Sequence, residues 1–406
     1  MIDADFVVRR AGQLATMVPA DGDPLGRVVD GALAARAGRV VWIGPDSEVE
    51  RNVRLDGDAL DAAGACVIPG LVDAHTHPVF AGSRADEFFE RQVGSAYQAQ
   101  QSGERGIMRT VRATRSADAS TLLELAESRA GRFLVNGTTT IEAKSGYGLE
   151  LGSEAKSLEV LAALRGRMPL RIVPTFLGAH VVPAGSDRLN YLRSLTEEML
   201  PALAARARFC DAWCDAHAFT AGETRTILRR ARELGYGLRV HAAQLAPGEG
   251  PEIAAELHAA SADHLEYATA PQLRAMANAG TVAVLCPAAN LTTHAPRPPI
   301  EAMRESGVRI AVASDLNPGT SNSESLPMAM SLACIGWGMT PTEVLRGATV
   351  EAAASLGLDA IAGCLRLGSF ADLAVVDVET PEAIPYYVGV NRVVRTVVGG
   401  VVWQPL

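Results

Sequence analysis

The stretch VDAHTHPVF, residues 72–80, places two histidines one residue apart, after an apolar run and a Pro-Gly pair. Residues i and i+2 of a β-strand point to the same side. If the stretch ends a buried strand, His75 and His77 face the same space. Such a pair indicates a metal site, because neutral imidazole is a good ligand for zinc or ferrous iron. Two surface histidines in a loop would show the same spacing, so the interpretation depends on the rest of the chain.

The middle of the chain alternates buried-strand runs with helical patterns. After VIPGLVDAHTH come seven further runs, each followed by a helical pattern: TTTIEAKSGYG, RIVPTFLGAH, RFCDAWCDAHAF, GLRVHAAQ, SADHLEY, TVAVLCPAAN and VRIAVASDLN. Periodicity of this kind is typical of α/β proteins with parallel strands. Eight strand–helix units in succession predict a (β/α)₈ barrel of the TIM type.

The two ends of the chain differ from this middle. Residues 1–62 contain the β-like runs ADFVVRR and ALAARAGRVVWIGP, and the tail from 363 contains GSFADLAVVDV and NRVVRTVVGGVVW. Glycine and aspartate interrupt these runs, as in short twisted strands. We expect a small β-sandwich domain built from residues 1–66 and 363–406, and a barrel domain over residues 67–362.

Composition limits the classes of partner. The chain of 406 residues carries a formal net charge of -9, which disfavours nucleic acid and anionic membranes as main partners. No apolar run is long enough to span a bilayer, and the start MIDADFVVRR lacks the pattern of a signal peptide. The six cysteines are scattered rather than clustered, as in proteins of reducing compartments. These features predict a cytoplasmic protein with a small-molecule substrate.

Other polar residues also fall where predicted strands end. They are Tyr147, His180, His241, Gln244, His264 and Asp315. Each residue alone has an ordinary explanation, such as a capped core histidine or a helix-capping aspartate. Together they lie at the C-terminal ends of barrel strands, where enzymes of this fold build their active sites. The joint pattern therefore predicts a catalytic site at that end of the barrel.

Metal-assisted hydrolysis is the chemistry that fits these residue types. We predict that His75, His77, His241 and Asp315 bind one metal ion and leave room for a water molecule. A bound metal lowers the pKa of water from 15.7 to about 7, and a neighbouring carboxylate can accept the proton. His264 is then available to hydrogen-bond this water or to polarise a carbonyl group.

The motifs that carry these residues resemble known families. PGLVDAHTH, RVHAAQ, ADHLEY and ASDLNPG are similar to signatures of the amidohydrolase superfamily. HTHPVFAGSRADEF, EAKSGYGLE, PTFLGAH, HAAQL, ASDLNPGTSN and YYVGVN resemble, in order, blocks of the imidazolonepropionase family, and the likeness runs from about residue 60 to the C-terminus. EAKSGYGL and SDLNPGT are its specific parts, because PGLVDAHTH alone indicates only an amidohydrolase.

The resemblance implies a reaction and its setting. Members open the cyclic amide of imidazolone propionate with water, which yields N-formimidoyl-L-glutamate in histidine degradation. The resemblance also implies one divalent metal per subunit, Zn²⁺ or iron (Fe²⁺/Fe³⁺), a composite domain from the two termini, and a homodimer.

By position, the resemblance also implies a set of substrate contacts. They are Arg84, Tyr147, His180, Gln244, Asn317, Gly319 and Thr320. Arg84 can hold a propionate carboxylate with two parallel hydrogen bonds, and Tyr147 can flank a small polar ring. The segment around Asn317 also reads as an ordinary Asn-Pro-Gly turn, so its contacts depend mainly on the resemblance.

Two departures from the family pattern affect the interpretation. Position 244 is Gln, where some members have Glu, and Gln cannot carry a proton. We therefore expect Gln244 to orient the substrate while Asp315 and His264 move protons. Residues 103–107 read GERGI where the family tends to have GGGI, which leaves the contribution of nearby Tyr97 open.

Two alternative functions share part of this evidence. A different amidohydrolase, such as a deaminase of a heteroaromatic ring or an enzyme for another cyclic amide or amidine, would have the same fold and metal. Arg84 and the EAKSGYGL block favour a substrate with an acidic arm. A non-catalytic barrel is disfavoured because all four predicted ligands are present. Lys144 could bridge two metals if carboxylated, but it lies in the block that matches the mononuclear family.

Overall fold

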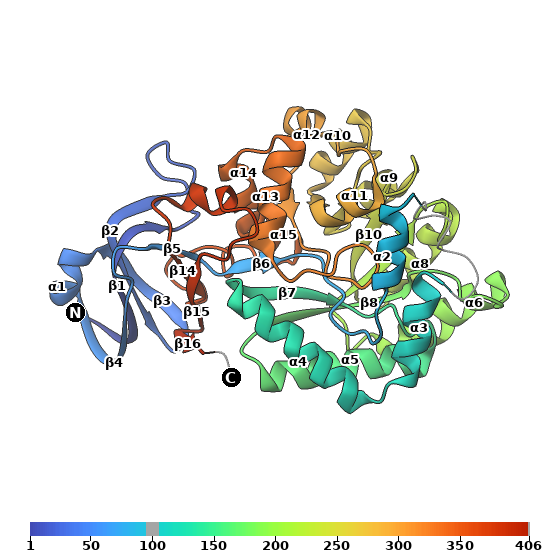
Figure 1. Cartoon of the computed structure of the whole chain (residues 1–406), viewed down its shortest axis with the longest axis horizontal. Helices are drawn as coiled ribbons and strands as arrows, with labels where there is room; N and C mark the ends of the chain where they lie inside the picture. The colour runs from blue at the N-terminus through green and yellow to red at the C-terminus, as the bar shows by residue number, and fades with distance from the viewer. Residues whose placement is uncertain (95–104, 405–406) are drawn as a thin grey trace.

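The structure, a computed structural model, describes residues 1–94 and 105–404. Figure 1 shows two parts: a lobe of strands that contains both ends of the chain, and a larger part in which helices surround a central sheet. The strands of the smaller lobe are blue and red in that view, because they come from the beginning and the end of the sequence.

Eight parallel strands form the predicted barrel, in the order β13-β12-β11-β10-β9-β8-β7-β6. They are β6 (Leu71–Asp73), β7 (Thr138–Lys144), β8 (Arg171–Ala179), β9 (Phe209–Cys214), β10 (Gly237–Ala242), β11 (Ser261–His264), β12 (Val282–Leu285) and β13 (Ile310–Val312). Beyond β6 and β13 the chain pairs once more at Thr76 and Leu316, and the Asp315 amide donates to the His75 carbonyl over 3.0 Å. This pairing brings the first and last strands together, and the predicted α/β barrel is confirmed.

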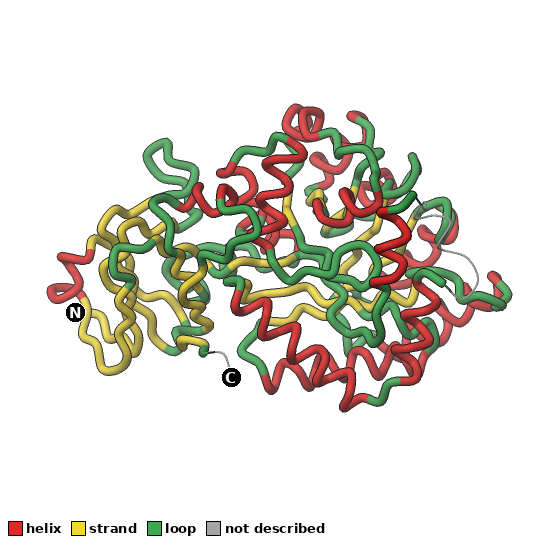
Figure 2. The backbone as a smooth tube through the Cα atoms, viewed as in Figure 1, coloured by secondary structure: helices red, strands yellow, loops and turns green. Residues whose placement is uncertain are grey.

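Helices follow the strands and cover the outside of the barrel (Figure 2). They are α4 (Ala119–Val135), α5 (Leu151–Arg167), α6 (Arg188–Arg193), α7 (Leu200–Leu203), α8 (Ala221–Glu233), α9 (Gly250–Glu256), α10 (Ala270–Ala279), α11 (Pro287–Thr293), α12 (Ile300–Ser306), α13 (Leu326–Trp337), α14 (Pro341–Gly347) and α15 (Val350–Ser355). A π-helical turn, Ser194–Met199, joins α6 to α7. Asp118 caps the start of α4 by accepting from the Thr121 amide, and Gly137 follows its end with φ 82°.

Two helices interrupt the first strand–helix unit. They are α2 (Ala85–Gln92) and α3 (Ile107–Ser116), both between β6 and α4. The sequence patterns did not predict them, because neither segment shows a clear apolar stripe: four of the eight residues of α2 and three of the ten residues of α3 are charged. Their position places Arg84 and Ile107 beside the open end of the barrel.

The terminal segments form one sheet of eight strands. They are β1 (Ile2–Ala15), β2 (Arg27–Arg36), β3 (Arg39–Pro45), β4 (Val53–Asp61), β5 (Cys66–Pro69), β14 (Leu373–Val376), β15 (Val393–Val398) and β16 (Val401–Trp403). Strand β14 pairs with β5, so the C-terminal strands join the N-terminal ones as predicted. Phe6 and Val8 of β1 lie in one apolar core and Val7 in another, the two-faced burial expected of a sandwich. Short helices η1 (Asp46–Glu48), α1 (Val49–Asn52) and η4 (Pro381–Tyr386) complete this part.

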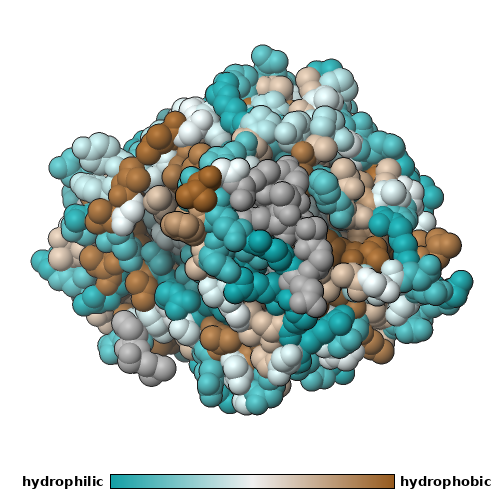
Figure 3. Space-filling model, turned by 45° about the vertical axis from the view of Figure 1, so that its right-hand side comes forward, coloured by the Kyte–Doolittle hydropathy of each residue, from teal (hydrophilic) through white to brown (hydrophobic). Residues whose placement is uncertain are grey.

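The surface of the molecule is mixed. Figure 3 shows broad hydrophilic areas with separate apolar patches between them. Within the described part of the chain, no helix is long and apolar enough to cross a membrane.

Candidate metal centre at the barrel mouth

The two histidines of the opening motif lie just beyond the first barrel strand. Strand β6 ends at Asp73, earlier than a strand through His77 would require. The single bridge at Thr76 nevertheless keeps the alternation of the chain, so His75 and His77 point to the same side. Both are buried, at 0% and 2% exposure.

The four predicted ligands converge at this point. The Nε2 atoms of His75 and His77 are 3.3 Å apart, and Asp315 Oδ1 lies 3.5 Å from the former and 3.6 Å from the latter. His241 also has a ring nitrogen within 4.8 Å of the nitrogens of both histidines. Zinc–ligand bonds of about 2.0–2.2 Å in a tetrahedral arrangement separate neighbouring donors by roughly 3.4 Å. The donor set therefore fits one divalent metal ion.

Buried carboxylates orient two of these histidines. His75 Nδ1 lies 2.7 Å from Asp263 Oδ2, and His241 Nδ1 lies 2.9 Å from Asp211 Oδ2. A metal-binding histidine usually donates its second ring N–H to such a partner, which fixes the tautomer and leaves the other nitrogen for the metal. Sequence patterns gave no role to Asp211 or Asp263, although each is a charged residue within an apolar strand.

A buried ion network holds these carboxylates in turn. Lys144 Nζ lies 2.7 Å from Asp211 and 2.8 Å from Glu142, and Arg239 lies 3.2 Å from Asp263. Burial opposes the charge of Lys144, yet Asp211 and Glu142 raise its pKa above the ordinary value. Lys144 therefore serves, with Arg239, as a cation of this network.

Burial holds four of the histidines at the mouth neutral. Loss of hydration lowers the pKa of His75 and His77 well below the ordinary value, and lowers that of His180 and His264 to about 3. His180 Nδ1 lies 3.0 Å from the Gly146 carbonyl, so its Nε2 is left for another partner. Neutral imidazoles can bind a metal or donate a single hydrogen bond to a substrate.

A single cavity brings most of the predicted site residues together. Its lining includes His77, Arg84, Tyr147, His180, His241, Gln244, His264, Asp315, Asn317 and Thr320. His75 lies deeper, against His77, and Gly319 lines a neighbouring cavity. Trp213 and Ile107 also line the site and were not predicted. The only indication in the sequence for Trp213 was that it is itself a bulky apolar residue near the end of a strand.

Arg84 is a buried cation at the edge of this cavity. Its Nε donates to Glu87 over 2.7 Å, and its Nη2 has no hydrogen-bond partner among the described residues. The guanidinium lies so close to Gly319 that a Cβ atom there would collide with it. Glycine at position 319 thus makes room for Arg84, a role that spacing alone does not reveal.

The side chain of Asn317 is occupied within its own loop. Its Oδ1 accepts from the amides of Gly319 and Thr320, both over 2.8 Å, and its Nδ2 donates to the Asp315 carbonyl over 2.7 Å. This is the Asn-Pro-Gly turn that the sequence also allowed. The turn fixes the backbone that carries Asp315.

Two residues whose roles the sequence did not assign are not among the residues of this cavity. His217 is exposed beyond β9, and Tyr97 falls outside the described residues. Cys286, by contrast, lies at the mouth of the barrel. It follows the seventh strand, for which the sequence predicted no site residue.

Known proteins show which family shares this arrangement. A model described as "Amidohydrolase family" matches residues 189–402. The imidazolonepropionase of Symbiobacterium thermophilum is 44% identical over 98% of this chain and 97% of its own length. That of Geobacillus kaustophilus is 39% identical over 97% and 96%. This chain belongs to the imidazolonepropionase family. The protein is therefore a hydrolase.

Solved structures share the fold at lower identity. The adenosine deaminase of Xanthomonas campestris with bound zinc has a TM-score of 0.73, 17% identity, and alignment over 99% of this chain and 93% of that one. The guanine deaminase of E. coli has a TM-score of 0.77, 16% identity, and alignment over 98% and 99%. At such identities the likeness concerns the fold alone.

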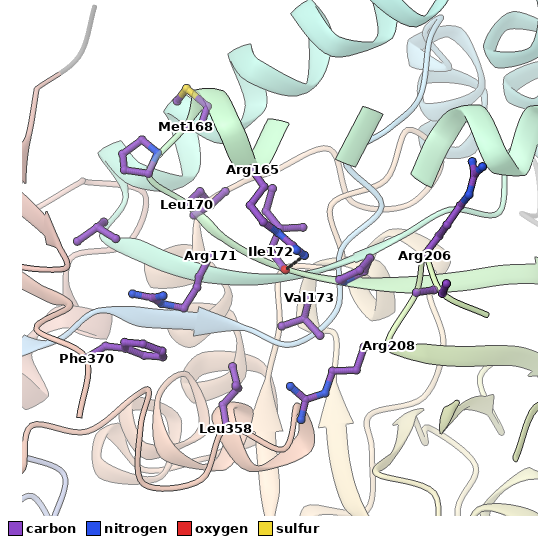
Figure 4. Close-up of a pocket in the computed structure, with 15 residues that line it drawn as sticks. Arg165, Met168, Leu170, Arg171, Ile172, Val173, Arg206, Arg208, Leu358 and Phe370 are labelled. Atoms are coloured by element: carbon purple, nitrogen blue, oxygen red, sulfur yellow. Dashed lines mark hydrogen bonds between the residues drawn. The ribbon is translucent and has the colours of Figure 1, made fainter. Parts of the chain in front are cut away.

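A larger cavity in this imidazolonepropionase-family chain lies at the opposite end of the barrel strands. It measures about 740 Å³ and lies where β8 begins, with Arg165, Arg171 and Arg208 among its lining residues (Figure 4). Arg171 is paired with Asp372, and Arg208 Nη2 donates to the Gly357 carbonyl over 3.1 Å. None of the predicted site residues is among the described residues that line it.

Proposed function

We propose that the protein hydrolyses 4-imidazolone-5-propanoate to N-formimidoyl-L-glutamate in histidine degradation. One observation carries the proposal: the cluster of His75, His77, His241 and Asp315 adjoins the cavity that a buried arginine with an unpartnered Nη2 also lines. A hydrolytic metal suits a cyclic amide, and a buried cation suits the propionate arm. Membership in the imidazolonepropionase family supports the same substrate.

In the proposed complex, Arg84 binds the propionate carboxylate. Tyr147 and His180 line the same cavity, with ring centroids 5.5 Å apart, and flank and hydrogen-bond the five-membered ring. Gln244, which is buried at the cavity wall, orients the ring through its amide. These contacts leave the ring carbonyl toward His264 and Asp315.

The reaction adds one water molecule and breaks one C–N bond. A divalent metal held by His75, His77, His241 and Asp315 would supply Lewis acidity and lower the pKa of water. Asp315 accepts a proton as the water oxygen bonds to the ring carbonyl carbon. His264, neutral at physiological pH, donates a hydrogen bond to the carbonyl oxygen. Asp315 then returns the proton to the departing ring nitrogen, and the water oxygen remains in the new carboxylate.

The setting of the enzyme is part of the proposal. We infer one Zn²⁺ or iron ion per subunit, a homodimer, and a cytoplasmic location without nucleic-acid or membrane partners. Residues 1–66 and 363–406 would form the small domain and residues 67–362 the catalytic one. The three clustered histidines with Asp315 support the single metal, and the net charge of -9 supports the absence of anionic partners.

The direct test is turnover of freshly prepared substrate. Imidazolone propionate, generated from urocanate by urocanase, is added to metal-loaded protein, and ring absorbance and N-formimidoylglutamate are followed together. We expect rapid loss of the ring with formation of this product. His75→Ala should abolish it, whereas His217→Ala, which alters an exposed histidine outside the cavity, should leave it unchanged.

Loss of substrate no faster than the blank, in protein shown to hold its metal, would reject this substrate. Other cyclic amides, amidines and heteroaromatic bases would then be screened with the same two variants. Turnover of a neutral base, insensitive to Arg84→Gln, would establish the deaminase alternative instead.

A further inference from the structure

A buried thiol lies beside the metal centre. Cys286 has 0% exposure, and its Sγ lies within 4.8 Å of donor atoms of His75, His264 and Asp315, which are equally close to one another. Among the described residues Cys286 forms no disulfide, and the buried Nδ1 atom of His264 has no hydrogen-bond partner. A free thiol and an imidazole with an unpartnered nitrogen therefore lie beside two proposed metal ligands.

The topology of the barrel explains this cluster. Cys286 directly follows β12, which pairs with β11 on one side and with β13 on the other. His264 ends β11 and Asp315 follows β13, so the thiol lies between them at the same end of the sheet. The cluster is thus fixed by three adjacent strands rather than by a mobile loop.

We propose that His75, His264, Cys286 and Asp315 form a second metal position that selects thiophilic divalent ions such as Cd²⁺. Thiolate is a soft ligand, and two imidazoles with one thiolate and one carboxylate make a four-donor set for these ions. Binding would displace the thiol proton, because a metal-bound cysteine is a thiolate. The proposal rests on the proposed hydrolytic ligand set, with which it shares two residues.

The two positions exclude each other. His75 Nδ1 is engaged by Asp263, so only Nε2 can bind a metal. A neutral imidazole nitrogen has one lone pair, and His75 Nε2 cannot serve two ions at once. An ion at the second position also takes His264 and Asp315, the residues proposed to handle the carbonyl and the proton. A thiophilic ion held there would therefore bind tightly, one per chain, and inhibit hydrolysis.

Spectroscopy of the full-length protein distinguishes the positions. Metal-free protein is titrated with Cd²⁺, and the sulfur-to-cadmium charge-transfer band and the ¹¹³Cd NMR shift are recorded. We expect one Cd²⁺ per chain with a thiolate signature in the unmodified protein. Cys286→Ala should remove the band and weaken Cd²⁺ binding by more than about 100-fold, beyond the effect typical of an indirect contact. Cys210→Ala, which alters an equally buried thiol in β9, should retain both.

A second pair of variants separates the ligand sets. His264→Ala should weaken the band, while His77→Ala should preserve it and abolish only the hydrolytic position. One bound Cd²⁺ without a thiolate signature in the unmodified protein would overturn the proposal, as would a band that survives Cys286→Ala. These readouts do not depend on turnover, so an inactive protein with the expected cadmium spectrum would reject the proposed reaction and keep this site.

Discussion

The two ends of the barrel contrast in what their cavities contain. The cavity at the beginning of the strands is large, about 740 Å³, and its arginines bind carbonyl groups or acidic side chains of the protein itself. The cavity at the other end is small, and its histidines and aspartate are almost completely buried. Cavity volume alone would indicate the first cavity as the active site. The buried polar groups without hydrogen-bond partners indicate the second.

The difference follows from the cost of burying polar groups. Burying a polar side chain without a hydrogen-bond partner costs about 1–3 kcal/mol of folding free energy in protein measurements. At the mouth, His77 Nδ1, His264 Nδ1 and Arg84 Nη2 are buried and have no partners among the described residues. A protein retains such groups where a ligand completes their interactions. Exposed arginines at the other end keep contact with water and need no ligand.

The largest effect should come from the carboxylate at the mouth. Asp315→Asn keeps the shape of the side chain but removes a charged ligand and the proposed proton carrier. We expect turnover to fall by about 10³-fold or more. Arg208→Gln at the opposite end is the matched control and should keep full activity. Equal losses in both variants, measured as kcat/KM with metal content checked, would contradict the contrast between the two ends.

Substitution of Arg84 tests whether the cavity at the barrel mouth binds the carboxylate arm of the substrate. A charged hydrogen bond contributes about 1.5–3 kcal/mol, so Arg84→Gln should raise KM roughly 10- to 100-fold with a smaller change in kcat. The substitution also breaks the ion pair between Arg84 and Glu87, so the double variant Arg84→Gln/Glu87→Gln separates recognition from stability. If the double variant regains the original KM, then Arg84 contributes through Glu87 and not through the substrate.

Much of this site was accessible from the sequence, for a physical reason. Of the predicted ligands, His241 lies near the end of β10 and Asp315 follows β13, and all parallel strands of a barrel end on the same side. The charged residues inside the strands were not accessible in this way. Lys144 and Asp211 come from different strands, and only the register of the barrel reveals that they pair. Gly319 was expected as a substrate contact, and its close approach to Arg84 became visible only in three dimensions.

The same argument applies to the fold. The eight strands and the joining of the two termini follow from apolar periodicity, which local sequence carries. Helices α2 and α3 were missed because their burial does not follow apolar periodicity: in α2, Glu87 and Arg91 are buried while Phe88 and Phe89 are exposed, and in α3 two of the three buried residues are threonines. Which residues of these two helices are buried depends on their contacts with the rest of the fold, which the local sequence does not show.

The carboxylates beneath the metal ligands should have an intermediate effect. Asp211→Asn removes the charge that orients His241, and we expect the affinity for the hydrolytic metal to fall about 10- to 100-fold. Asp372→Asn is a suitable control, since Asp372 is also buried and paired with an arginine, but at the opposite end. Metal affinities from competition with a chelator provide the comparison. Unchanged affinity in Asp211→Asn would mean that His241 is held in place without it.

The smallest effect should come from an ion pair that keeps contact with water. Glu343, at the start of α14, binds Arg304, and both side chains are about one-third exposed, at 32% and 36%. The hydrogen bond from Arg304 lowers the pKa of Glu343 to about 2, against an ordinary value of 4.5. The folded state therefore holds fewer protons than the unfolded state between these values. The pair stabilises above pH 4.5, and this stabilisation is lost as the pH falls toward 2.

Solvent screening keeps this contribution below about 1 kcal/mol. We expect urea unfolding of Glu343→Gln to show a small deficit at pH 6 that shrinks as the pH falls through 4.5. Glu305→Gln, which alters an exposed glutamate of α12, should show no deficit at either pH. A deficit several times larger, or one that grows toward acid pH, would mean that charges on the outer helices are coupled to the fold as strongly as those at the mouth. The contrast between buried and hydrated charge would then fail as a guide to where the protein does its chemistry.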